Sequence, residues 1–197
     1  MNVHDTMRRL AGHPFAGIVA AGAVLTAILG YLVVDRVLLI SRGREVVLAI
    51  RPVDPRDLFK GDYVRLAYDI SNLPTTVISK EVEAEWRARL GLSRRPIYVI
   101  LEQQQDGNWQ PVAASMDRPD ALPPNRVAIR GRALNSDPRR LRYGIERYYV
   151  PEGTGGRLEN LARETKLSVI VAVDTSGTAA IKGLVADGKR IYDEPLL

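Results

Sequence analysis

The chain has 197 residues, a formal net charge of +5 and no cysteine. The absence of cysteine excludes a thiol nucleophile, a thiolate zinc site and a disulfide scaffold. The 28 basic residues are interspersed with 23 acidic ones. No basic run is long enough to form a nucleic-acid-binding tail, so nucleic acid is not an expected partner.

A long apolar segment lies near the N-terminus. Residues 15–34 (FAGIVAAGAVLTAILGYLVV) carry no charge. At about 1.5 Å per residue, a helix of this length extends roughly 30 Å, the thickness of the hydrocarbon layer of a bilayer. Pro14 suits a helix start, and Tyr31 suits the membrane interface. We therefore predict a head at 1–14, a transmembrane helix with a juxtamembrane stretch at 15–40, and a soluble domain at 41–197.

Two other interpretations of the apolar segment are weaker. A signal peptide usually has an apolar region of about 7–15 residues that ends at a small-residue cleavage site. Here the small residues 20–23 lie in the middle of the segment. A core helix seldom requires so many uncharged residues. The segment is therefore expected to remain as a single-pass anchor.

The orientation of this anchor rests on opposing features. Arg8 and Arg9 precede it, whereas Arg36, Arg42 and Arg44 follow it. This distribution slightly opposes a cytoplasmic N-terminus under the positive-inside rule. The short head and long tail instead suit a signal anchor. We expect an inner (cytoplasmic) membrane protein of a bacterial envelope whose soluble domain is extracytoplasmic, in the periplasm.

One face of the predicted helix carries small side chains. Gly22, Thr26 and Gly30 recur at four-residue spacing. Small residues at this spacing allow a second helix to approach closely. We therefore expect an integral membrane protein as a partner, in addition to the lipid bilayer.

Beyond Arg44 the pattern changes to short strands bounded by turn residues. Strands are predicted at residues 45–50, 63–70, 97–103, 109–115, 127–133, 167–173, 178–185 and 190–192. Turns are predicted at 106–108, 174–177 and 187–188, where glycine follows or accompanies aspartate. Two helices are predicted, from Ser79 to Leu90 and from about Gly155 to Glu164, the first capped by Ser79.

The two halves of this region resemble each other. Residues 54–61 (DPRDLFKG) align without a gap on residues 137–144 (DPRRLRYG). A strand, a helix, a strand and a hairpin are expected after each copy, so repeats are proposed at about 45–120 and 125–195. We predict an α+β, mainly β domain: a pseudo-twofold β-barrel of double-psi or cradle type with two helices.

One short motif connects the chain to a known family. Residues 61–68 (GDYVRLAY) match every fixed position of the motif that names the GDYXXLXY family. Residues 52–57, 148–153 and 180–184 also resemble that family. The resemblance implies an uncharacterised bacterial membrane-anchored protein, often encoded beside multi-spanning membrane proteins. It supplies no catalytic residues.

The motif and the turn before it form the candidate functional or structural site. It comprises Asp54, Arg56, Asp57, Gly61, Asp62, Tyr63, Leu66 and Tyr68. In a structural interpretation, the Asp-Pro-Arg turn and the Gly-Asp bend fix a strand crossover, with Tyr63 on the face opposite to Leu66 and Tyr68.

A chemical interpretation gives the carboxylates of Asp54, Asp57 and Asp62 a direct role. Three carboxylates provide oxygen ligands for a divalent cation or groups for acid–base chemistry. However, Arg56 would neutralise such a cluster, and the second copy lacks two of the three carboxylates. No metal site and no cofactor are therefore predicted.

The sequence thus favours a membrane-anchored envelope protein that acts as a non-enzymatic binding or assembly module with another membrane protein. The alternative is an extracytoplasmic ligand-binding or hydrolytic barrel that uses the aspartate cluster.

Overall fold

A computed structural model of the protein describes residues 14–51, 63–88, 95–135, 137–149 and 167–193. The chain divides into two compact units, Met1–Leu38 and Leu39–Leu197.

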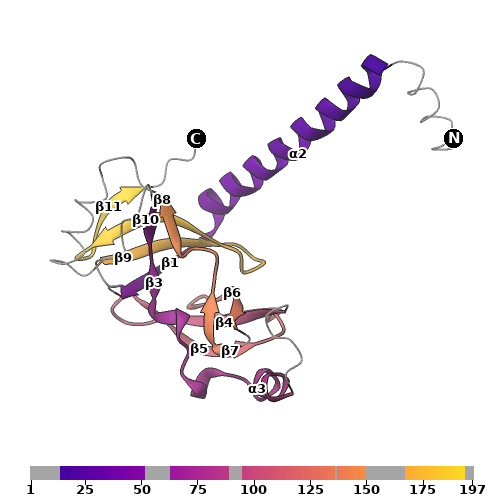
Figure 1. Cartoon of the computed structure of the whole chain (residues 1–197). Helices are drawn as coiled ribbons and strands as arrows, with labels where there is room; N and C mark the ends of the chain where they lie inside the picture. Colours follow the sequence, from indigo (N-terminus) through magenta and orange to yellow (C-terminus); the bar gives the residue numbers. More distant parts are fainter. Residues whose placement is uncertain (1–13, 52–62, 89–94, 136, 150–166, 194–197) are drawn as a thin grey trace. The chain divides into compact units, whose positions relative to one another are not determined.

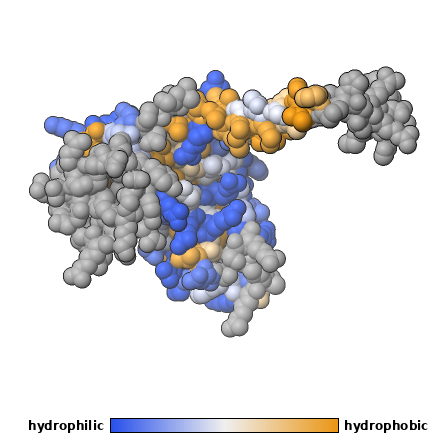
Figure 2. All heavy atoms as spheres, turned by 45° about the horizontal axis from the view of Figure 1, so that its top comes forward, coloured by the Kyte–Doolittle hydropathy of each residue, from blue (hydrophilic) through white to orange (hydrophobic). Residues whose placement is uncertain are grey.

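The apolar segment forms one long helix, α2 (Pro14–Arg42) (Figure 1). Its large apolar side chains are exposed from Phe15 to Val34, and Figure 2 shows them as a hydrophobic run. The part Gly17–Arg42 is long and apolar enough to cross a membrane. The helix is longer than predicted because charges such as Asp35 and Arg36 end an apolar run without ending a helix.

A tight turn joins the end of α2 to the first strand. The Gly43 N–H donates to the Leu39 carbonyl at 2.9 Å. A Cβ atom on Gly43 would approach that carbonyl oxygen far inside contact distance and would also press on Ala172. Leu39 and Ile40 are buried with Ala180. The turn therefore requires a residue without a side chain.

The second unit is mainly β. Its strands are β1 (Arg44–Arg51), β2 (Tyr63–Arg65), β3 (Ala67–Tyr68), β4 (Pro96–Gln103), β5 (Trp109–Ser115), β6 (Arg126–Leu134), β7 (Asp137–Arg142), β8 (Arg147–Tyr149), β9 (Leu167–Val173), β10 (Ala179–Ala186) and β11 (Lys189–Asp193). The short helices are η1 (Asp69–Ser71), η2 (Thr75–Val77) and α3 (Lys80–Arg87). The predicted strands outside 63–70 are confirmed to within about one residue at most ends.

The strands form three antiparallel sheets. The orders are β11-β10-β9-β1-β3, β5-β4-β6-β7 and β2-β8. In each of the first two sheets, a hairpin from one half of the chain lies beside a strand from the other half. Strand β9 of the β9-β10 hairpin pairs with β1, and strand β4 of the β4-β5 hairpin pairs with β6. Among the described strands no sheet closes on itself, so the mainly β fold is confirmed, whereas closure into a barrel and the double-psi connection are not.

Both large sheets contribute to one apolar core. Alternate residues of β4, namely Ile97, Val99 and Leu101, are fully buried. They belong to the same cluster as Leu48 of β1 and Val171 of β9. The strand-forming, period-two pattern of the sequence therefore places one side of each sheet in a shared interior.

Three local predictions have different outcomes. Ser79 caps α3 as expected, accepting the Val82 N–H at 3.4 Å, but α3 ends at Arg87. The sequence predicts no strand at residues 137–142, but they form strand β7 at a sheet edge, where Pro138 is tolerated without its N–H. The helix predicted at 155–164 and the first copy of the repeat at 54–61 lie outside the described residues.

Candidate functional site

The structure describes part of the candidate site. Asp54, Arg56, Asp57, Gly61 and Asp62 lie outside the described residues. The remaining members are on a single stretch: Tyr63 in β2, Leu66 at the break after it, and Tyr68 in β3. The cluster of three carboxylates is therefore not tested by the geometry.

At Leu66 the chain passes from one sheet to another. Before it, β2 pairs with β8, with Val64 opposite Tyr148. After it, β3 pairs with β1, with Tyr68 opposite Ile50. The strand predicted over 63–70 is thus interrupted, because the two parts have different neighbours. Leu66 is buried, and its N–H donates to the Glu146 carbonyl at 2.9 Å.

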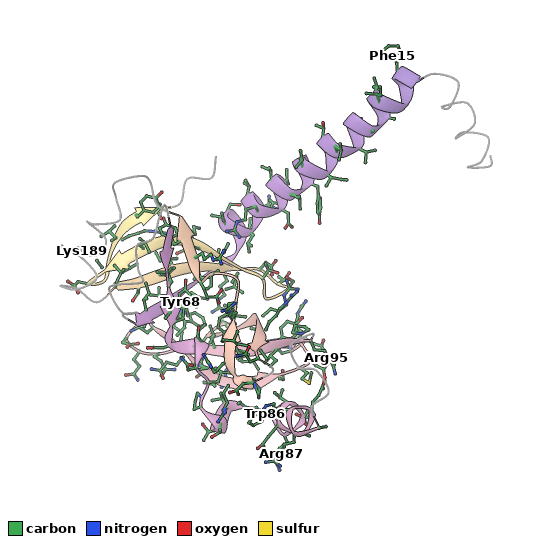
Figure 3. All side chains as sticks on the ribbon, in the orientation of Figure 1. Phe15, Tyr68, Trp86, Arg87, Arg95 and Lys189 are labelled. Carbon is green, nitrogen blue, oxygen red and sulfur yellow. The ribbon has the colours of Figure 1, made fainter. Side chains whose placement is uncertain are left out.

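The last tyrosine of the motif ties this crossover to the second half of the chain. Tyr68 is completely buried, and its hydroxyl donates to the Ile145 carbonyl at 2.7 Å. In return, the buried Tyr143 hydroxyl donates to the Ile70 carbonyl at 2.6 Å. We call Tyr68 and Tyr143 the tyrosine clamp. Figure 3 labels Tyr68 within the second unit.

A carboxylate supports the clamp from the turn that follows Tyr143. Glu146 accepts the backbone N–H groups of Tyr143 at 2.5 Å and Gly144 at 3.1 Å. Gly144 has φ of +83°, a conformation that favours glycine. The turn therefore holds Ile145 where its carbonyl meets the Tyr68 hydroxyl.

Both clamp tyrosines are kept in their neutral form. Burial raises the pKa of Tyr68 well above its ordinary value, and the Glu146 charge raises it further. The same two causes raise the pKa of Tyr143. A phenol that is buried, neutral and bonded to a carbonyl is a structural donor, because its proton is not available for exchange with a substrate.

The sequence missed this pairing of tyrosines. Its signal is a Tyr-x-Ile triplet that occurs at residues 68–70 and again at 143–145. The offset between these triplets is 75 residues, whereas the Asp-Pro-Arg alignment has an offset of 83. The two offsets differ, so an ungapped alignment of the Asp-Pro-Arg segments does not bring the triplets together.

The second Asp-Pro-Arg sequence, at the start of strand β7, shows how its carboxylate is used. Asp137 accepts the backbone N–H of Arg139 and two bonds from its guanidinium, each at 3.0 Å. These bonds hold the pKa of Asp137 below its usual range. The Arg139 guanidinium also lies 5.1 Å from the ring centre of Trp86 on α3. In this copy the carboxylate and the arginine therefore neutralise each other.

Clustered metal ligands and buried charges are both missing from the described part of the chain. Among the residues of known placement, no three His, Cys, Asp or Glu side chains come together as metal ligands. The same residues include no buried charged side chain. The neutral hydroxyl groups of the tyrosine clamp join segments 68–70 and 143–145 by hydrogen bonds.

The helix-packing face lies on α2. Gly22, Thr26 and Gly30 are all exposed within the first unit. A Cβ atom built on Gly22 or Gly30 meets nothing within 4 Å. These three positions are therefore uncovered within the first unit, and their role in helix packing stays a prediction.

Comparison with known proteins identifies the family. The model of the family described as GDYXXLXY protein matches residues 25–184, which is most of the chain. The protein therefore belongs to the GDYXXLXY family, and the motif at 61–68 carries the residues for which the family is named. No curated protein and no solved structure matches the chain.

Proposed function

We propose that this protein is a single-pass membrane-anchored envelope protein, and that it acts as a non-enzymatic binding or assembly module with another membrane protein. The observation that supports this proposal is the exposed apolar surface of α2. Burial of one large apolar side chain is worth about 1.5–3 kcal/mol. Leaving the apolar side chains of α2 in water would therefore cost more than the roughly 5–15 kcal/mol that stabilises an ordinary domain.

The proposed location is the inner membrane, with the domain on the extracytoplasmic side. A fusion of alkaline phosphatase to Leu197 tests it, because the phosphatase is active only outside the cytoplasm. An active fusion is expected. An inactive fusion, together with a fluorescent protein fusion that folds in the cytoplasm, would reverse the orientation.

The proposed partner is an integral membrane protein that packs against the small-residue face of α2. Helices in lipid associate through close packing, which small residues permit. Gly22 and Gly30 leave room for such an approach, since nothing in the described part of the chain fills the space beside them. The neutral, structural use of the tyrosine clamp supports an assembly role over a catalytic one.

Affinity purification after mild solubilisation tests the partner. The full-length chain is expected to bring down a membrane protein in a fixed ratio. The double variant Gly22→Ile/Gly30→Ile should lose that protein, because the added side chains keep a second helix away. The matched control, Gly17→Ile/Ala21→Ile, lies on the opposite side of the helix and should retain it. A wild-type chain recovered alone and monomeric would refute the proposal.

We further propose that the domain consists of two related halves with pseudo-twofold symmetry, in the manner of cradle-type barrels. Two features support this. The orders β10-β9-β1-β3 and β5-β4-β6-β7 repeat one pairing scheme with strands exchanged between halves. The tyrosine clamp is reciprocal, since each half donates one hydroxyl to the other. An experimental structure of residues 52–62 and 150–166 would test the remaining connections.

A further inference from the structure

An unusual set of arginines lies on the outer side of the sheet β5-β4-β6-β7. Strand β6 alternates between buried and exposed residues, so that Arg130 and Arg132 point away from the core. The neighbouring strand β7 exposes Arg140 and Arg142 in the same way, on either side of the buried Leu141. We call these four residues the arginine face. Strands β6 and β7 lie side by side in Figure 1.

The arginine face places like charges directly opposite each other. Arg132 is the register partner of Arg142 on β7. Like charges in opposing positions on neighbouring strands destabilise a sheet. The other end of β6 shows the opposite arrangement, because Arg126 lies opposite Glu102 and forms an ion pair with it at 2.7 Å.

Five other described arginines of the domain are paired with acidic residues, unlike those of the arginine face. Arg87, Arg95, Arg126, Arg139 and Arg190 all form ion pairs with carboxylates. Within the described residues, the face has no ion pair, and its single hydrogen bond from a guanidinium runs from Arg130 to the Thr178 hydroxyl at 3.2 Å. The Asp137 carboxylate attracts Arg140 without forming an ion pair, so the four guanidinium groups keep further donors available on one side of the sheet.

The glycine between Arg130 and Arg132 packs closely against the core beneath the arginine face. A Cβ atom on Gly131 would lie 3.0 Å from the Tyr143 ring. The ring of this clamp tyrosine thus packs beneath the point where the two arginines diverge. The face is built on a rigid part of the fold, since Tyr143 is itself fixed by its bond to Ile70.

We propose that the arginine face binds an acidic segment of a protein partner. Charge complementarity supports this, because the planar guanidinium group forms paired hydrogen bonds with carboxylates. A lipid surface is less suited, since the exposed large apolar residues of the described domain, Val112 and Ile191, lie on neither β6 nor β7. Nucleic acid is less suited as well, because the described face presents no fully exposed aromatic ring for stacking. The inference rests on the proposed binding function and names the partner's chemistry.

A labelled oligoglutamate peptide tests this surface directly. The full-length protein is held in nanodiscs of zwitterionic lipid, and peptide binding is measured at rising salt concentration. We expect binding that weakens with salt, and no binding of oligoglutamine. Arg142→Glu should weaken binding by about tenfold or more, because it removes one attractive charge and adds a repulsive one. The melting temperature of this variant should not fall, because the substitution places a carboxylate opposite the Arg132 guanidinium.

The matched control is Arg118→Glu, which makes the same charge change on the exposed loop after β5. This variant should bind the peptide nearly as well as the wild type. Equal losses in the two variants would overturn the proposal, since they would show attraction to net charge alone. Absence of wild-type binding would overturn it too. Binding of phosphatidylglycerol vesicles or RNA that Arg142→Glu abolishes, without peptide binding, would replace the proteinaceous partner with a lipid or nucleic acid.

The same variants separate this inference from the proposed function. If the protein copurifies a membrane partner that Arg142→Glu retains fully, the assembly role stands and the arginine face is not its docking surface. If the chain is always recovered alone but still binds oligoglutamate through Arg142, the partner helix proposed for α2 is refuted while the surface remains.

Discussion

Removal of one hydroxyl from the tyrosine clamp should destabilise the domain measurably. Tyr68→Phe keeps the ring in the core but leaves the Ile145 carbonyl without its 2.7 Å bond. A buried polar group that loses its partner costs about 1–3 kcal/mol. Because Tyr68 is fully buried, no water can replace the hydroxyl without opening the core. We expect a loss of about 1–3 kcal/mol in the free energy of unfolding.

Urea denaturation of the full-length protein in an uncharged detergent measures this loss. The two tryptophans of the chain, Trp86 and Trp109, both belong to the second unit and report on its unfolding. Tyr143→Phe should have a similar effect, since its hydroxyl is bonded at 2.6 Å to the Ile70 carbonyl. The partly exposed Tyr98 supplies the control, and Tyr98→Phe should change stability by less than about 0.5 kcal/mol.

The double variant examines whether the two bonds act together. Both connect the same pair of segments, 68–70 and 143–145, so loss of one should loosen the geometry of the other. The combined loss is therefore expected to be smaller than the sum of the single losses. A Tyr68→Phe variant as stable as Tyr98→Phe would refute the clamp, because it would show that the Ile145 carbonyl needs no protein donor.

Three other properties of the domain can be measured in similar assays. The domain should lose stability as the pH rises above about 10, the ordinary phenol pKa. Folding raises the pKa values of Tyr68 and Tyr143, so their neutral forms favour the folded state and this contribution is lost at higher pH. The double Phe variant should show a weaker alkaline dependence in the same denaturation assay. Gly43→Ala should destabilise the turn after α2 by about 1–3 kcal/mol, since its Cβ would overlap a backbone carbonyl, and a thermal melt that matches wild type would contradict this. Arg142→Glu should raise stability by about 0.2–1 kcal/mol, because an attractive pair with Arg132 replaces a repulsive one, and a decrease in the urea midpoint would count against the register.

The sequence predicted best those elements whose signals are local. Strands β5 and β9 have the predicted bounds, because alternating apolar residues end at turn residues. The turns themselves use glycine where φ is positive, +82° at Gly107 and +84° at Gly177. Ser79 caps a helix as its position suggests. Each of these depends on a few neighbouring residues.

The features that the sequence missed depend on distant partners. Strand β7 is rich in arginine and begins with Asp-Pro, so no local rule favours a strand there. Its pairing with β6 decides its conformation. Similarly, alternation over 63–70 could not reveal that the chain changes neighbours at Leu66. The tyrosine clamp joins residues more than 70 positions apart, and the Tyr-x-Ile triplet in each segment does not by itself reveal its partner.

Alkaline carbonate extraction of isolated membranes tests most directly whether α2 anchors the intact chain in a membrane. Carbonate releases peripheral and soluble proteins but leaves transmembrane helices in the pellet. We predict that the protein remains in the pellet and that its mass is that of the full 21.8 kDa chain. A shortened protein in the supernatant, lacking the apolar segment, would show that the segment is removed and would contradict the claim.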